Sequence, residues 1–333
     1  MNGSRSWRTG PLPRLTGAVL LAVLALAVAV LSLISGSSHL SASAALHALA
    51  GQGDAVTRGI VLQLRLPRLL AAFGIGSLLA LAGVLLQALF RNPLADPFIL
   101  GVSGGAAVGA VLALGLGAAL AGVQGAAAAG ALAAVLAVYA LGGGGGATRL
   151  LLAGVALASL CGAVVTVVIS AADADRIRGM VFWLGGDLGA VQRPLACLGA
   201  GCAAVAAAVV LARPLNVLAA GELRARSVGL DPGPWRALLY GLAAVLTGLA
   251  VVNAGTIGFV GLITPHSARL LFRTANHRIV APAAALLGGT VLAAADLLAR
   301  TLAGPRQLPV GAILAIAGTP LFLLLLRTRA GSR

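Results

Sequence analysis

Long apolar stretches with almost no charge dominate this sequence and restrict what it can fold into. They recur from residue 15 to residue 326, separated by short polar, proline-containing or glycine-containing breaks. Only 9% of the 333 residues are charged, whereas a soluble domain carries about 25%. So few charges cannot cover a soluble surface, and the sequence therefore predicts an all-α polytopic membrane protein.

The apolar stretches predict about ten transmembrane helices, because one crossing needs about 20 residues. The expected helices are Leu15–Ser35, Leu66–Phe90, Phe98–Leu120, Val123–Leu141, Leu150–Ala171, Leu195–Leu211, Trp235–Val252, Ile257–Phe272, Ile279–Thr301 and Leu308–Leu326. The eighth stretch is short and could be a partial span. A signal peptide is a competing interpretation of the first stretch, but a signal peptide has only about 7–15 apolar residues.

The spans predict a single transmembrane domain, residues 15–328, between tails at residues 1–14 and 329–333. An even number of helices places both termini on one side. Most of the 23 basic residues then fall on the cytoplasmic side, as the positive-inside rule requires. All of them are arginine, and a chain without lysine cannot form the P-loop of an ATPase. We therefore expect a transport protein that is not itself an enzyme and has no catalytic residues.

The ionisable residues form no recognisable ligand site. The arginines stand singly or in pairs between apolar stretches, without interleaved aromatics, so nucleic acid is not an expected partner and membrane lipid is. Cys161, Cys197 and Cys202 lie inside apolar stretches, where a thiol is usually a small buried side chain. The histidines have no metal-ligand spacing. The sequence therefore predicts no metal site and no cofactor in this chain.

The segment RNPLADP, residues 91–97, interrupts two apolar stretches. Asp96 followed by Pro97 predicts a helix start, because the carboxylate can accept from free N–H groups and proline fits the first helical position. Gly101, Gly105 and Gly109 follow at four-residue spacing. Such spacing lets two helices approach closely, and the same helix could also border a pathway.

Three further features permit either an ordinary or a functional interpretation. The glycine run at residues 142–149 is a flexible inner loop or a gate. The polar segment at residues 216–234 predicts a short amphipathic helix that is either solvated or a docking surface for an energy source. Arg65, Arg68 and Arg300 mark span ends on the outer face, where they either reach into the interface or bind an acidic partner. Asp296 can pair with Arg300 across one helix turn.

Four motifs occur in a fixed order: QALFRNPLADPFILGVSGGAAVGA, GTIGFVGLITPHSARLLF, LAAADLLART and QLPVGAILAIAGTPLFLLLL. From about Arg65 to Leu326 the chain resembles the permease subunits of ABC importers for iron-siderophores, vitamin B12 and haem. The resemblance implies ten helices in the bacterial cytoplasmic membrane and a second permease subunit, as a homodimer or a heterodimer. It also implies two ATPase subunits, which bind ATP and Mg on the inner face, and an extracytoplasmic substrate-binding protein.

The resemblance implies a path lined mainly by the fifth and tenth helices, and an iron-siderophore is the expected cargo because it prevails in the family. Cobalamin and haem are the alternatives. The implied site residues fall into three groups. They are Arg65, Arg68 and Arg300 for docking of the binding protein, Asn92, Leu94, Ala147 and Thr148 for the cytoplasmic gate, and Glu222, Leu223, Ala225, Val228, Gly229 and Leu230 for coupling to the ATPase.

Two departures from the family pattern stand out. Gln307 occupies a position before LPVG where the family usually has glutamate, so an outer carboxylate is missing, and GGGGGA replaces a polar gate loop. Two other classes of membrane protein are alternatives. An ion-coupled transporter needs ionisable residues at mid-membrane, and Asp296 is the one candidate. A structural membrane protein without a path is disfavoured weakly by the glycine-rich helices.

Overall fold

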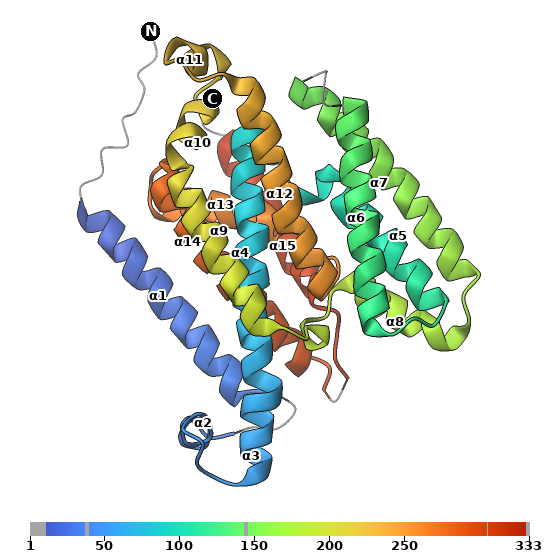
Figure 1. The fold of residues 1–333 in the computed structure, drawn as a ribbon. Helices are drawn as coiled ribbons and strands as arrows, with labels where there is room; N and C mark the ends of the chain where they lie inside the picture. Colours follow the sequence, from blue (N-terminus) through green and yellow to red (C-terminus); the bar gives the residue numbers. More distant parts are fainter. Residues whose placement is uncertain (1–10, 37–39, 143–145, 305, 331–333) are drawn as a thin grey trace.

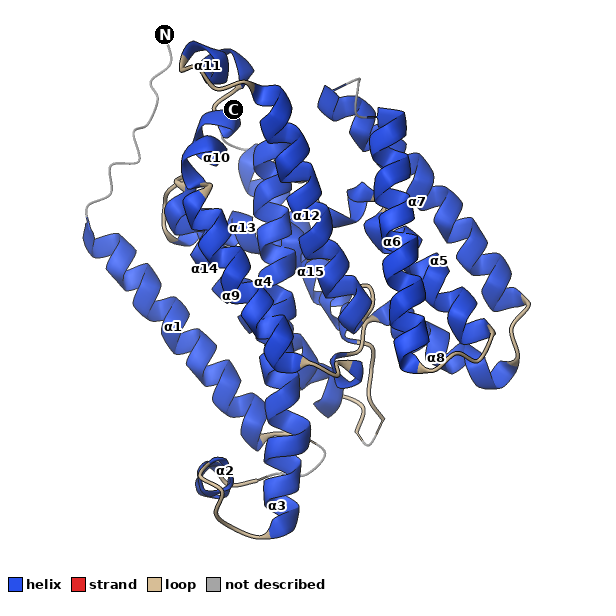
Figure 2. Cartoon of the chain, viewed as in Figure 1, coloured by secondary structure: helices blue, strands red, loops and turns tan. Residues whose placement is uncertain are grey.

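The computed structural model describes residues 11–36, 40–142, 146–304 and 306–330, and every regular element in these ranges is a helix (Figure 2). This confirms the predicted all-α class. The α-helices are α1 (Pro11–Ile34), α2 (Ala42–Leu49), α3 (Ala55–Gly59), α4 (Leu66–Leu89), α5 (Val102–Gly115), α6 (Leu120–Gly142), α7 (Gly146–Ser170), α8 (Ala174–Gly185), α9 (Pro194–Val210), α10 (Ala212–Ala219), α11 (Glu222–Ser227), α12 (Pro232–Ala254), α13 (Val260–Leu271), α14 (His277–Thr301) and α15 (Val310–Ala330). A π-helical turn, η1 (Ile60–Arg65), and two 3₁₀ turns, η2 (Pro97–Leu100) and η4 (Leu188–Ala190), complete the described elements.

Each of the ten predicted ranges contains a helix. Six helical segments are long and apolar enough to cross a membrane alone, and the bent pair α9–α10, with 62° between its members, raises this to seven. Helix α5 and the first part of α15 are shorter. Helix α13 has 12 residues, or about 18 Å at the usual rise, which fits the expected partial span. The ten-crossing topology stays a prediction, and parts of both predicted tails lie outside the described residues.

Helix α4 is the centre of the larger group of helices, where α9, α12, α13 and α14 pack around it. Glycines allow backbones to touch there. A Cβ on Gly76 would lie 2.3 Å from the Gly288 carbonyl oxygen, and one on Gly83 would lie 1.9 Å from the Gly261 oxygen. Both distances are far below van der Waals contact, so α4 meets α14 and α13 backbone to backbone. This is the small-residue packing typical of membrane helices.

A second group contains α5, α6, α7 and α8 and lies beside the first, with α12 between them (Figure 1). Helix α12 contacts α4 on one side and α5 and α6 on the other. Much of α7 is exposed: only 11% of its apolar window is buried, against 83% for the segment that contains α4. The α7 surface is therefore available to lipid or to another subunit.

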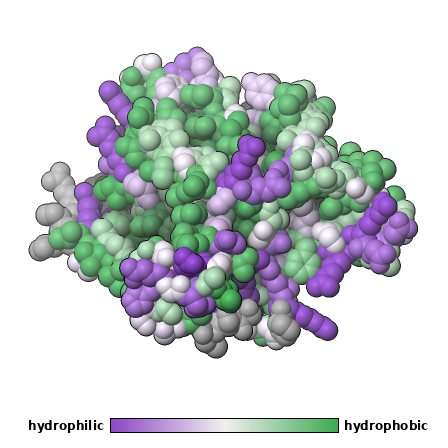
Figure 3. Space-filling view, turned by 60° about the horizontal axis from the view of Figure 1, so that its bottom comes forward, coloured by the Kyte–Doolittle hydropathy of each residue, from purple (hydrophilic) through white to green (hydrophobic). Residues whose placement is uncertain are grey.

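The two ends of the bundle carry different short helices. Helices α10 and α11 lie at one end and α2 and α3 at the other (Figure 1). Viewed toward the α2 and α3 end, hydrophilic side chains occupy the centre and rim between hydrophobic surfaces (Figure 3). Under the predicted topology the α10–α11 end is the inner end and the α2–α3 end is the outer end, and we use these names below.

The sequence interpretation missed several outer elements. Helices α2, α3 and α8 fall in regions that were expected to connect spans. The helix expected from Leu66 is part of a longer apolar segment, Ala55–Leu89. Pro67 lies in the first turn of α4, where a proline ring lacks the N–H of a normal helical hydrogen bond. In the structure the π-turn η1 precedes it and keeps the helical path continuous.

Candidate functional site

The predicted coupling segment forms a defined turn at the inner end. Helix α11 ends in a Schellman motif, in which the N–H of Leu230 donates to the Ala225 carbonyl and the N–H of Gly229 donates to the Arg226 carbonyl, at 2.9 and 3.0 Å. Gly229 has φ +77°, with open space where a Cβ would stand. Its role is therefore conformational, because a side chain would strain this left-handed position.

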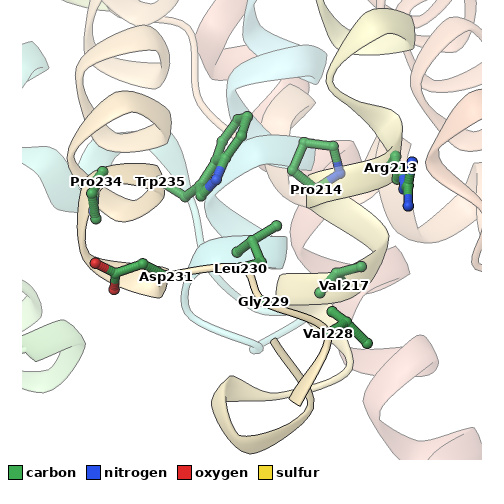
Figure 4. Close-up of a pocket in the computed structure, with 9 residues that line it drawn as sticks. All are labelled: Arg213, Pro214, Val217, Val228, Gly229, Leu230, Asp231, Pro234 and Trp235. Carbon is green, nitrogen blue, oxygen red and sulfur yellow. The ribbon is translucent and has the colours of Figure 1, made fainter. Parts of the chain in front are cut away.

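The same segment exposes two apolar side chains. Leu223 is 87% exposed and Val228 is 62% exposed, whereas Ala225 between them is fully buried. A cavity of about 520 Å³ lies next to them, between α10 and the start of α12. Leu230, Trp235 and Pro214 are among the residues that line it (Figure 4). Exposed apolar side chains next to a cavity are typical of a protein-docking surface.

Glu222, the only glutamate, joins the coupling segment to two other elements. Its carboxylate accepts a hydrogen bond from Arg236 of α12 and lies 3.9 Å from the guanidinium of Arg91. Arg91 follows α4 and has φ 50°, an uncommon conformation for a non-glycine residue. Glu222 therefore bridges the RNPLADP turn and the first turns of α12.

The RNPLADP turn is built as the sequence predicts. The Asp96 carboxylate accepts from the N–H of Phe98 at 2.8 Å, and Pro97 begins the 3₁₀ turn η2. Burial raises the pKa of the Asp96 carboxyl to about 6, and the hydrogen bond from Phe98 opposes this shift. Helix α5 begins one turn later than expected.

The predicted gate residues lie on two neighbouring elements. Asn92 and Leu94 are exposed, and the Asn92 side chain accepts from the N–H of Leu94 at 2.9 Å, so it closes its own turn. Ala147 and Thr148 lie in the first turn of α7, where Thr148 is exposed and the Ala147 side chain lies outside the described part. Residues 143–145 of the glycine run are also outside it. The turn η2, which follows this segment, contacts α7, and the gate role of the four residues stays a prediction.

The three glycines at four-residue spacing have two different roles. A Cβ on Gly105 would lie 2.2 Å from the Gly130 carbonyl oxygen, and one on Gly109 would lie 2.0 Å from that of Ala126. These two glycines therefore allow α5 and α6 to pack backbone to backbone. Gly101 instead has φ +74° and precedes α5, so it allows the sharp turn from η2. A path beside these glycines stays a prediction.

At the outer end, two of the three predicted docking arginines hold the C-terminus of α1. Arg65 is 4% exposed and donates to the Leu33 carbonyl at 2.7 Å. Arg300 donates to the carbonyls of Ser32 and Ser35, each at 3.4 Å. Positive charge at these free carbonyls also suits the negative end of the helix dipole. Both arginines therefore have a structural role, and their docking role stays a prediction.

Asp296 is the buried carboxylate of this cluster. It is 3% exposed, accepts from Arg300 Nε at 2.8 Å and lies 3.6 Å from Arg68 Nη1. The expected Asp296–Arg300 pair is thus present. A carboxylate fixed between two cations at an outer helix end is a poor proton or sodium carrier, which weakens the ion-coupled alternative.

Arg68 also contacts residues that the sequence analysis did not group with it. Its Nη2 donates to Gln307 Oε1 at 2.9 Å, and Gln307 Nε2 donates to Asp187 Oδ1 at 3.0 Å. Asp187 therefore places a carboxylate directly beside Gln307. Because 120 residues separate Gln307 from Asp187, no local pattern could have predicted this contact.

The remaining polar residues of the inner end stabilise helix packing. Asn216 of α10 accepts from the backbone N–H of His277 at 2.9 Å and contacts His277 Nδ1 at 2.7 Å. Its amide nitrogen donates to Asn276 at 3.0 Å. Within the described ranges, no three histidine, cysteine or acidic side chains are grouped to hold a metal ion.

Comparisons with known proteins agree on one family. A profile of the FecCD transport family matches residues 23–328. The chain is 45% identical to the cobalamin import system permease protein BtuC of Halobacterium salinarum over 279 residues, which cover 81% of this chain and 74% of that protein. It is 39% identical to the vitamin B12 import system permease protein BtuC of Escherichia coli O9:H4 over 325 residues, 93% of this chain and 94% of that one.

Solved structures show the same architecture. An inward-facing conformation of a metal-chelate type ABC transporter matches with a TM-score of 0.83 at 32% identity, covering 93% of this chain and 98% of that one. PsaBC from Streptococcus pneumoniae, with a TM-score of 0.57, 17% identity and coverage of 84% and 94%, shares the fold. The chain therefore belongs to the FecCD transport family and is an ABC importer permease, a multi-pass protein of the cytoplasmic membrane.

Proposed function

We propose that this chain is the permease of a cobalamin importer. The observation that carries the proposal is the identity of its relatives: proteins named as cobalamin or vitamin B12 import permeases match it at 38–45% identity over 80% or more of its length. This favours the cobalamin alternative over the iron-siderophore expectation, which rested only on prevalence. Cobalamin is itself a metal chelate, so the metal-chelate type structure is compatible with it.

The inner end supports an ATPase partner. Leu223 and Val228 present apolar surface beside the cavity at α10 and α12, and the sequence has no lysine for a phosphate-binding loop. ATP and Mg would therefore be bound by separate subunits that dock on α11. The chain itself would bind no cofactor and catalyse no reaction.

A second permease subunit is needed to enclose the path. The described cavities measure about 280–520 Å³, which is at or below the lower part of the range of about 300–1,000 Å³ that suits drug-sized molecules, and cobalamin is larger than such molecules. Helix α7 is the most exposed of the described membrane-spanning helices. The path would form where the α7 and α15 surfaces of two subunits face each other.

The outer end supports docking of the binding protein mainly through Arg68. Its side chain is 21% exposed, against 12% for Arg300, and Arg65 is almost fully buried. The Arg68 donors that Gln307 and Asp296 do not engage would pair with a carboxylate of the partner. Arg65 and Arg300 would contribute by holding this surface in place.

Uptake by proteoliposomes tests the proposal. The chain is reconstituted with its cognate ATPase and binding protein, and uptake of labelled cyanocobalamin is measured with and without ATP. We expect ATP-dependent uptake that unlabelled cyanocobalamin abolishes and ferrichrome or haemin leaves unchanged. Uptake of ferrichrome or haemin instead would overturn the cargo. Uptake driven by a proton gradient, with the chain alone, would overturn the importer mechanism.

A further inference from the structure

Helix α12 connects the two functional ends of the molecule. It begins at Pro232, immediately after the coupling segment, and ends at Ala254 in the outer end. Its 23 residues span about 34 Å at the usual helical rise. It also separates the two groups of helices (Figure 1). A displacement at one end of such a helix must appear at the other unless the helix bends.

The outer end of α12 is bonded to the Arg68 cluster through Asp187. The Asp187 N–H donates to the Ala254 carbonyl at 2.8 Å, while the Asp187 carboxylate accepts from Gln307 and Gln307 accepts from Arg68. Gln307 accepts from a cation on one side and donates to an anion on the other. An amide side chain is the type that can do both.

The inner end of α12 is bonded to the coupling segment through Arg236. Arg236 donates to Glu222 in the first turn of α11, and Glu222 also pairs with Arg91 after α4. The side chains of these three residues are 28–52% exposed. An exposed pair adds little stability, so its contribution here is directional: it fixes the orientation of α11 relative to α12.

Helix α12 is freer to move than the other central helices. Helices α4, α13 and α14 touch backbone to backbone at Gly76–Gly288 and Gly83–Gly261, where nothing can slide. The glycines along α12 make no such approach: Gly241 has open space at its Cβ position, and Gly248 meets only a Val102 methyl at 3.9 Å. At the C-terminal end, by contrast, a Cβ on Gly255 would lie 2.1 Å from the Trp183 carbonyl oxygen, so this end of α12 is held to the segment that leads to Asp187 and moves with it. Side-chain contacts permit small shear movements that backbone contacts prevent.

We propose that α12 transmits docking of the binding protein to the ATPase face, with Gln307 and Asp187 as positioning residues at its outer end and Arg236 and Glu222 at its inner end. The inference rests on the proposed function. A binding protein that engages Arg68 shifts Gln307 and Asp187, Asp187 moves the end of α12, and Arg236 then turns α11 against the ATPase.

Stimulation of ATP hydrolysis by the binding protein tests this relay in the reconstituted complex. Asp187→Ala and Arg236→Ala should each reduce stimulation by at least about tenfold, the effect of one charge-assisted hydrogen bond. Basal hydrolysis and nucleotide-free affinity for the binding protein should stay at wild-type values. If both residues act through α12, the double variant should lose no more stimulation than the more defective of the two single variants. If the two sites are independent, their tenfold losses should multiply to about a hundredfold.

Two further sets of variants keep the test decisive. Gln307→Glu places a second carboxylate beside that of Asp187 and should abolish stimulation by the binding protein. Adding Asp187→Asn should restore stimulation, because the amide at position 187 then donates to the carboxylate at position 307. Asp173→Ala and Arg278→Ala remove exposed charges at the outer and inner ends and should leave stimulation unchanged.

The outcomes separate the two proposals. A wild-type complex that the binding protein does not stimulate contradicts the proposed function. Normal stimulation in Asp187→Ala, a multiplicative double variant, or a Gln307→Glu defect that Asp187→Asn does not rescue overturns the relay alone. If Asp187→Ala loses affinity for the binding protein by the same factor as it loses stimulation, Asp187 acts in docking, and this result also overturns the relay.

Discussion

The outer and inner ends of the molecule both gather arginines around one carboxylate, and they differ in burial. At the outer end, the Asp296 side chain is 5% exposed between Arg300 and Arg68. At the inner end, the Glu222 side chain is 42% exposed between Arg236 and Arg91. A buried charge cannot lose its partners without a large penalty, whereas an exposed pair exchanges with water at little cost. The outer cluster is therefore built to hold a shape, whereas the inner cluster can reorient together with α11 and α12 at little cost.

The largest expected effect is on Asp296. Asp296→Ala should lower the free energy of unfolding by about 3 kcal/mol, because it leaves two partly buried guanidinium groups without their carboxylate. Chemical or thermal unfolding in detergent measures the change. Asp173→Ala is the matched control, since that carboxylate is 79% exposed and pairs with Arg176 at the surface. Equal losses in the two variants would remove the distinction between buried and exposed clusters.

A smaller effect is expected at the exposed apolar surface of the coupling segment. Leu223→Ala should weaken binding of the purified ATPase by about 2 kcal/mol, the value of the apolar groups removed from a buried contact. Stability of the permease should not change, because Leu223 is exposed in the chain alone. Titration of ATPase onto the detergent-solubilised permease measures the affinity. Leu20→Ala, at an exposed position of α1, should have wild-type affinity, and a loss there would show a general effect.

The conformation of Gly229 should contribute less. Gly229→Ala forces a side chain into a left-handed position with φ +77°, which costs roughly 1–2 kcal/mol. Part of that strain should appear as reduced coupling, seen as a lower ratio of transport to ATP hydrolysis. Gly233→Ala is the control, since Gly233 lies only four residues further on, in the first turn of α12, with an ordinary backbone conformation. Normal coupling in Gly229→Ala would show that the Schellman turn is dispensable.

The smallest expected change in stability is at Glu222. Glu222→Gln should lower the free energy of unfolding by less than about 1 kcal/mol, and high salt should reduce the difference further. Unfolding at two salt concentrations measures it. A loss close to that of Asp296→Ala would contradict the idea that the inner cluster is free to rearrange.

The class and the order of the helices could be predicted because they depend on local pattern. Apolar stretches place a helix in every predicted range, and the Asp96–Pro97 start is bonded as expected. Short amphipathic helices such as α8 were not predicted, because 12 residues with three charges resemble a loop when only apolar stretches are counted. The unbroken path through Pro67 was also missed, because a π-turn has no clear sequence pattern.

The residues of the site were predicted, but of their partners only the Asp296–Arg300 pair was, because it lies within one helix turn. The motifs identified Arg65, Arg68 and Arg300, yet the residues they contact come from α1, from Gln307 and from buried Asp296. The other partners, 32 to 268 positions apart in sequence, are brought together only by the tertiary fold, so spacing carries no signal for them. Asp187, which links Arg68 to α12 through Gln307, was not noticed at all because a single aspartate after two glycines is an ordinary turn residue.

The backbone contacts around α4 have a consequence for how this protein can evolve. Where peptide planes touch at Gly76–Gly288 and Gly83–Gly261, a single added methyl group has nowhere to go, so these positions tolerate almost no variation. Under the proposed function, adaptation to a differently shaped cargo would therefore be confined to surfaces such as that of α7, of which only 11% of the apolar window is buried. A rigid interior beside a surface that tolerates substitution would let one fold carry cargoes of different shapes.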